Sequence, residues 1–347
     1  MRIVLIGVVA AFLAGCGTTV PATPVTVAYA WQYRAGDYVR STPRVNNQVV
    51  YVGSDDNDLH AVNAETGQLR WKFQTGGNIT SQPVLSGDAV YFGSWDDNVY
   101  AVQASTGKSF WQYKTNSWVT ASPVLVKDVL YVGSNDGYLD ALGAADGHVI
   151  WRYQTNGRIE SAAVVEGDRV FFGSSDRYVY ALDGANGALV WRYRTEGAVL
   201  GVPSVTGGTV YVGSSDRRFY ALDESSGRLK WSFQGGGAFE SSPAVADGIV
   251  YVGCNDGLVY ALRASDGSPL WHFQAQGMIR SMPVVWRSAV FVASDDGSLY
   301  GLDRTTGALV WSYHTGGAIT ASPVVTADQL FIGSTDRRLY AFRLGQQ

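Results

Sequence analysis

Short apolar segments rich in Val, Tyr and Phe alternate with turns rich in Gly, Ser and Asp, and this pattern repeats every 40 residues. Tryptophan marks the period without insertion or deletion, at Trp31, Trp71, Trp111, Trp151, Trp191, Trp231, Trp271 and Trp311. A proline follows twelve residues after the tryptophan in seven of the eight units, with Ala163 as the exception. Self-similarity at a fixed period of this length is the signature of a repeat architecture.

One unit predicts four short strands. Within the unit from Ile79 to Trp111 the strands are expected at residues 79–85, 90–93, 99–102 and 109–113, with turn residues between them. Four short antiparallel strands per unit are typical of a propeller blade, and the 3.6-residue spacing of helices is absent. The pattern therefore predicts an all-β fold, an eight-bladed β-propeller with four antiparallel strands per blade.

The two ends of the repeat predict how the ring closes. The last unit ends near Phe342 and lacks a fourth strand. Residues Trp31 to Tyr33 match the fourth strand of a unit, but no first three strands come before them in the chain. We therefore expect the N-terminal strand to complete the last blade and remove its open edge. The predicted propeller spans residues 29–343.

The first 28 residues have a different character. Arg2 and the apolar run from Ile3 to Ala14 are typical of a secretory signal peptide, here residues 1–15. Leu-Ala-Gly-Cys at its end resembles the lipobox of bacterial lipoproteins, which implies lipidation of Cys16; Gly17, rather than Asp, favours the outer membrane. Residues 16–28 then form a Pro/Thr-rich tether. We expect a protein anchored by Cys16 to the periplasmic face of the outer membrane.

Composition excludes some partners and chemistries. The chain is 46% hydrophobic and 16% charged, with a net charge of −4, so it is globular and does not attract nucleic acid. Cys254 is the only cysteine after Cys16, and we expect it to be a buried core residue.

The segment from Ala61 to Trp71, with its Ala, Asn, Thr-Gly and Trp, resembles the tryptophan-docking motif of quinoprotein-like propellers. The resemblance covers nearly all of residues 28–343. It implies that each repeated tryptophan docks an outer strand onto the neighbouring blade, where the indole fills space that a small Ala leaves open.

Positions that every blade shares are interpreted as structural. One aspartate recurs in each predicted hairpin turn, where its side chain can accept backbone hydrogen bonds: Asp56, Asp96, Asp136, Asp176, Asp216, Asp256, Asp296 and Asp336. Departures from the repeat are the candidates for function. One position, predicted to ring the mouth of the central channel, varies as Arg40, Thr80, Thr120, Glu160, Leu200, Glu240, Arg280 and Thr320. Its two arginines and two glutamates could hold a polar ligand, or could simply pair with water and with each other.

Two further departures lie in the loops of the same predicted face. Arginines in the hairpins of blades 4, 5 and 8 suggest a basic sector for an acidic partner or lipid headgroups, or a solvated charge run: Arg177, Arg217, Arg218, Arg337 and Arg338. Trp95 and Trp118 are additional to the docking set and fall in neighbouring loops. They suggest an interface hot spot or a sugar-stacking platform, although each could fold over its own loop.

Catalysis is not expected. The family resemblance raises the possibility of a dehydrogenase that holds pyrroloquinoline quinone and Ca²⁺, but the chain has no adjacent cysteine pair, no long insertions and no convincing Asn and Asp ligands. The four histidines, His60, His148, His272 and His314, occupy different phases of the repeat, so the sequence indicates no metal or catalytic cluster. No cofactor is expected.

The lipobox and eight blades together resemble the lipoprotein subunit of the outer-membrane β-barrel assembly machinery. This resemblance implies a periplasmic scaffold that binds a periplasmic or outer-membrane protein, such as the barrel component, through the loops of one face. The alternative is a propeller that binds a cell-wall glycan or a peptide.

Overall fold

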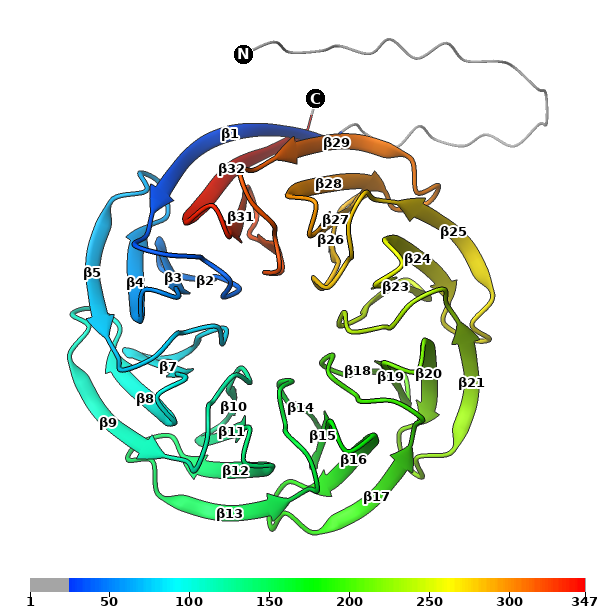
Figure 1. Ribbon diagram of the computed structural model, residues 1–347, viewed down its shortest axis with the longest axis horizontal. Helices are drawn as coiled ribbons and strands as arrows, with labels where there is room; N and C mark the ends of the chain where they lie inside the picture. Colours follow the sequence, from blue (N-terminus) through cyan, green and yellow to red (C-terminus); the bar gives the residue numbers. More distant parts are fainter. Residues whose placement is uncertain (1–24, 347) are drawn as a thin grey trace.

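The computed structural model describes residues 25–346, and the predicted signal peptide, Cys16 and most of the tether lie outside this range. Eight four-stranded antiparallel sheets form a closed ring, which confirms the predicted eight-bladed propeller (Figure 1). Within residues 25–346 there is no helix long and apolar enough to cross a membrane.

Strand numbers rise from the channel outward in blades 1 to 7, and in blade 8 the outermost strand is β1. Blades 1 to 4 contain β2 (Arg44–Asn46), β3 (Val49–Gly53), β4 (Asp58–Asn63) and β5 (Leu69–Gln74); β6 (Val84–Ser86), β7 (Ala89–Gly93), β8 (Asn98–Gln103) and β9 (Ser109–Lys114); β10 (Val124–Val126), β11 (Val129–Gly133), β12 (Tyr138–Gly143) and β13 (Val149–Gln154); and β14 (Val164–Glu166), β15 (Arg169–Gly173), β16 (Tyr178–Asp183) and β17 (Leu189–Arg194). Blades 5 to 8 contain β18 (Ser204–Thr206), β19 (Thr209–Gly213), β20 (Arg218–Asp223) and β21 (Leu229–Gln234); β22 (Ala244–Ala246), β23 (Ile249–Gly253), β24 (Leu258–Arg263) and β25 (Pro269–Gln274); β26 (Val284–Trp286), β27 (Ala289–Ala293), β28 (Ser298–Asp303) and β29 (Leu309–His314); and β30 (Val324–Val325), β31 (Gln329–Ser334), β32 (Arg338–Gln346) and β1 (Val25–Arg34).

The innermost strand of blade 2 is shorter than predicted. The sequence predicted a strand over residues 79–85, whereas β6 begins at Val84. Pro83 has no N–H to donate to a neighbouring strand. Before it, the Ser81 hydroxyl donates to the Gly93 carbonyl oxygen and accepts from the Gly93 N–H, both at 2.9 Å. The Ser81 side chain therefore makes hydrogen bonds to the Gly93 backbone in place of the backbone hydrogen bonds of a longer strand.

The N-terminal strand closes the ring as predicted. Outside β32, β1 completes the sheet of blade 8, with Trp31 paired opposite Ala341 (Figure 1). The pairing begins at Val25 with Gln346, so the ordered sheet extends four residues before, and three residues after, the predicted limits of 29 and 343. The added residues Val25 and Val27 pack against the buried core that contains Phe342 and Leu344.

Repeated tryptophans join consecutive blades. Each indole N–H donates, at 2.9–3.1 Å, to the carbonyl oxygen 33 residues later in the next blade, for Trp31, Trp71, Trp111, Trp151, Trp191, Trp231 and Trp271. The turn that receives Trp151 contains Gly187, which has a φ of 72° and leaves only 2.6 Å between a Cβ placed there and Trp151 Cε3. Glycine is required at this position both by its left-handed backbone and by the close indole.

Candidate functional site

The connections between blades and the hairpin turns after the second strand of each blade lie on one face, here called the hairpin face. Hydrogen bonds join the two kinds of loop, as in the Asp55 N–H to the Tyr38 carbonyl and the Asn135 N–H to the Trp118 carbonyl, both 2.9 Å. This common face was predicted from the sequence. The repeated aspartates support it: in blade 2, Asp96 accepts from the backbone N–H groups of Gly76 and Asn98 and from the Tyr100 hydroxyl.

At the positions predicted to ring the channel mouth, charged residues pair mainly within their own blade. Arg40 lies 2.5 Å from the Asp55 carboxylate, and Arg280 forms the equivalent ion pair with Asp295. In both pairs the partner is the hairpin residue 15 positions later. Arg40 and Arg280 are thus largely committed to hairpin carboxylates.

The threonines and glutamates at the equivalent positions of other blades do not form an ion pair with a hairpin carboxylate. Thr80 accepts a hydrogen bond from the Trp95 indole at 2.9 Å, and Thr120 donates to Asn135 at 3.0 Å. Glu160 lies 3.8 Å from Arg158 in an exposed ion pair, whereas Glu240 forms no ion pair among the described residues. Leu200 of blade 5 stands between these two carboxylates in the order of the ring.

Trp95 and Trp118 stack on each other across blades 2 and 3. Their ring centroids are 4.8 Å apart and their planes differ by 10°. The Arg40 guanidinium lies 5.6 Å from the Trp95 ring centroid, within the range of a cation–π contact. Trp118 is 48% exposed, although Trp95 is partly covered. Arg40, Trp95 and Trp118 form one group over three consecutive blades, which we call the aromatic cluster.

The hairpin arginines do not form one basic sector. Arg177 and Arg217 occupy neighbouring blades 4 and 5, but Arg337 lies in blade 8, on the opposite side of the ring (Figure 1). Each adopts a positive φ of 70–75° at a turn position that other blades fill with Gly, Asn or Asp. Arg218 contacts the Ser232 hydroxyl and Arg338 lies 3.4 Å from Asp336, so these two side chains are held in their own blades.

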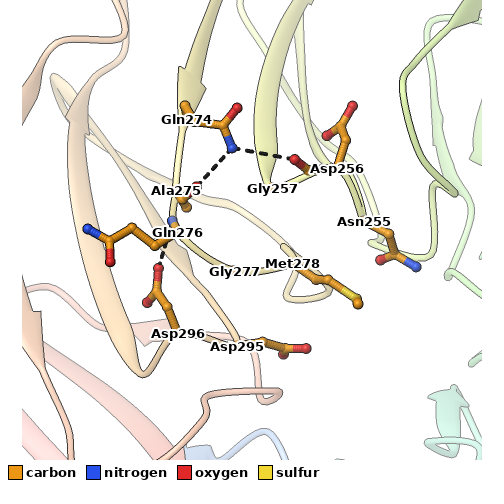
Figure 2. A pocket seen from close by; sticks show the side chains of 10 residues that line it. All are labelled: Asn255, Asp256, Gly257, Gln274, Ala275, Gln276, Gly277, Met278, Asp295 and Asp296. Atoms are coloured by element: carbon orange, nitrogen blue, oxygen red, sulfur yellow. Dashed lines mark hydrogen bonds between the residues drawn. The ribbon is translucent and has the colours of Figure 1, made fainter.

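A cavity of about 410 Å³ lies on the hairpin face between blades 6 and 7. Its lining includes Asn255, Met278, Asp295 and Asp296, and Figure 2 shows Met278 between Asn255 and Asp295 in this view. The Oδ1 atoms of Asn255 and Asp295 are buried and have no hydrogen-bond partner among the described residues. The cavity does not include the aromatic cluster.

A second group on the hairpin face was not predicted. Asp56, Asp58 and His60 each place one potential ligand atom within 4.8 Å of the others. Burial would raise the pKa of Asp56, but hydrogen bonds from His60 and from the backbone of Gly36 and Asp58 lower that pKa to about 2. The signal in the sequence was the Asp-x-Asp-x-His spacing: Asp58 and His60 share one side of β4 because they are two residues apart, and Asp56 lies in the turn just before that strand. The positions of the four histidines within the repeat did not reveal this group.

Cys254 is fully buried, as expected, and its burial raises the pKa of the thiol to about 12. A neutral, inaccessible thiol is unreactive.

This geometry defines the class of the protein: a closed eight-bladed propeller of quinoprotein-like repeats whose blades dock through tryptophan. The sequence matches the family described as outer membrane protein assembly factor BamB over residues 8–162 and again over residues 135–345. The chain belongs to this family.

Solved structures share the fold at low sequence identity. BamB from Moraxella catarrhalis superposes with a TM-score of 0.81 at 20% identity, covering 92% of this chain and 100% of that one. The computationally designed Ika8 protein gives a TM-score of 0.82 at 17% identity, covering 91% and 99%. Quinohemoprotein alcohol dehydrogenase from Comamonas testosteroni gives 0.79 at 15% identity, covering 91% and 76%. No curated protein matches the chain.

Proposed function

We propose that this protein is a non-enzymatic scaffold in outer-membrane protein assembly, anchored through Cys16 at the periplasmic face of the outer membrane, and that the aromatic cluster is its main partner-binding surface. Membership of the BamB family supports the role, and the lipobox supports the location. The observation that carries the choice of surface is the stacked Trp95–Trp118 pair with Arg40 beside it.

The aromatic cluster has the properties of an interface hot spot. Trp and Arg are the residues that most often dominate binding energy, and a flat, pre-stacked indole loses little conformational entropy on binding. Trp118 is 48% exposed, so a partner can still remove a large apolar area from water. The cluster is also built only from positions that differ between blades, so the ring does not need these residues to close.

A glycan-binding propeller is the alternative, because the exposed face of Trp118 could also stack on a sugar ring. A quinone-dependent dehydrogenase has less support. Asp55 and Asp295 at the mouth are neutralised by Arg40 and Arg280, and such carboxylates are poor ligands for Ca²⁺. We infer that the chain binds neither pyrroloquinoline quinone nor Ca²⁺ at this mouth.

The test is a mild-detergent pull-down of the tagged, lipidated chain from its native membrane, with mass spectrometry of the recovered proteins. We expect a component of outer-membrane protein assembly to be recovered by the wild type and lost with Trp118→Ala. Arg217→Ala, in the hairpin of blade 5 on the opposite side of the ring from blade 1, is the matched control and should retain the partner. Recovery of no such component, with binding to cell-wall glycan fragments instead, would favour the alternative.

A further inference from the structure

Blade 1 departs from the repeat at two positions of β4. Six blades carry tyrosine at the position of His60, and each of these tyrosines donates its hydroxyl to the repeated aspartate of its blade: Tyr100, Tyr180, Tyr220, Tyr260, Tyr300 and Tyr340. Asp58 is the second departure, since the equivalent residues are Asn98, Tyr138, Tyr178, Arg218, Leu258, Ser298 and Arg338. Blade 1 alone combines two carboxylates and an imidazole at this place in the repeat.

The spacing of these groups suits a metal ion. His60 Nε2 lies 3.1 and 3.2 Å from the two carboxylate oxygens of Asp56. Ligand atoms about 2.0–2.2 Å from a tetrahedral Zn²⁺ are roughly 3.3 Å apart, so little movement would be needed to admit an ion. His60 is 2% and Asp58 is 4% exposed, which restricts competition from water.

Asp58 supplies independent evidence that this group can bind a cation. Its Oδ1 atom is buried and has no hydrogen-bond partner among the described residues, while Oδ2 accepts from Lys72 Nζ at 2.7 Å. An unsatisfied buried carboxylate oxygen is costly, and a bound cation would satisfy it. The Lys72 side chain is 57% exposed, so its ammonium group can turn into solvent when an ion binds.

The second ring nitrogen of His60, Nδ1, has a hydrogen-bond partner, as in many metal-binding histidines. The Tyr33 hydroxyl, from β1 of blade 8, lies 3.0 Å from His60 Nδ1. A partner on the far nitrogen fixes the ring orientation of a metal-binding histidine and leaves Nε2 for the ion. The group therefore spans the boundary between blades 8 and 1.

We propose that Asp56, Asp58 and His60 bind one divalent transition-metal ion, with Zn²⁺ the best fit to two carboxylates and one imidazole. Imidazole favours Zn²⁺ over Ca²⁺ and Mg²⁺, which prefer all-oxygen sites. One water molecule would complete the tetrahedron. This site is separate from the aromatic cluster and does not depend on the proposed function.

The test is equilibrium dialysis of the purified mature chain against Zn²⁺, with bound zinc measured by mass spectrometry and affinity by competition with a chromophoric chelator. We expect one tightly bound zinc per chain. His60→Tyr restores the residue of six other blades and should fold normally, yet weaken zinc binding at least about tenfold. Asp58→Asn, which keeps the side-chain shape, should weaken it similarly.

Two controls make the result specific. His148 forms an exposed ion pair with Asp146 and is the obvious adventitious site, so His148→Gln should leave the zinc content unchanged. Tyr180→His places an imidazole beside Asp176 in blade 4 but without a second carboxylate, and it should add no zinc. Failure of the wild type to retain zinc, or full retention by His60→Tyr, would overturn the proposal.

Discussion

The docking layer, formed by the repeated tryptophans and the turns that receive them, differs sharply from the hairpin face. In the docking layer, one contact recurs around the ring: an indole N–H donates to the carbonyl oxygen 33 residues later, and a glycine leaves room for the ring. On the hairpin face, the residue at the mouth is Arg40, Thr80 or Glu160, and its partner changes with it. The comparison separates residues that every blade needs from residues that one blade has acquired.

Deleting residues 25–34 should have the largest effect. It removes β1, exposes the edge of β32 and uncovers the core around Phe342. We expect loss of cooperative unfolding in urea, followed by circular dichroism, and association seen by size-exclusion chromatography. A monomeric variant that unfolds in one transition like the wild type would show that closure by β1 is dispensable.

Trp151→Ala should have the second-largest effect on stability. The indole is 8% exposed, donates to the Gly184 carbonyl and packs against Tyr131, so its removal leaves a cavity between two blades. We expect the free energy of unfolding to fall by about 3–5 kcal/mol. Trp118→Ala is the control on the hairpin face and should change it by less than about 1 kcal/mol. Equal losses would erase the distinction between the two regions.

Gly187→Ala tests the same contact from its other side. A Cβ at this position would lie 2.6 Å from Trp151 Cε3, on a backbone with a φ of 72°. We expect a loss of roughly 1–3 kcal/mol in thermal or urea unfolding. Gly167→Ala shares the positive φ but has nothing within 4 Å of its Cβ, so it isolates the backbone part of the cost.

The smallest expected effect is an increase in stability, caused by Arg177→Gly. Arg177 has a φ of 75°, where Gly137, Gly257 and Gly297 stand in other blades. Arg177→Gly should relieve the left-handed strain and raise the unfolding free energy by about 0.5–1 kcal/mol. A loss of stability would mean that the Arg177 side chain makes contacts that outweigh its backbone strain.

Sequence reasoning was strongest where the repeat is strict. The tryptophan register predicted the number of blades, and the missing fourth strand after Phe342 predicted closure by β1. It was wrong on the start of the inner strand because the Ser81 side chain replaces backbone contacts with Gly93, an exchange that strand patterns do not reveal.

The candidate site was harder to predict. Departures from the repeat marked Trp95 and Trp118, but their stacking depends on the angle between two loops of neighbouring blades. The single basic sector was wrong because blade 8 lies across the ring from blades 4 and 5. His60 was overlooked because Asp56 was interpreted only as a repeated turn residue and the histidines were compared only by their positions in the repeat, without regard to neighbouring carboxylates such as Asp58.

The most direct test replaces the two stacked tryptophans with residues that other blades carry at the same positions. Trp95→Ser copies Ser175 and Ser215, and Trp118→Ala copies Ala198, Ala238 and Ala318. The double variant should unfold in urea within about 1 kcal/mol of the wild type and recover no assembly partner in the membrane pull-down. Undiminished partner recovery by this variant would contradict the claim that the departures from the repeat on the hairpin face carry the function.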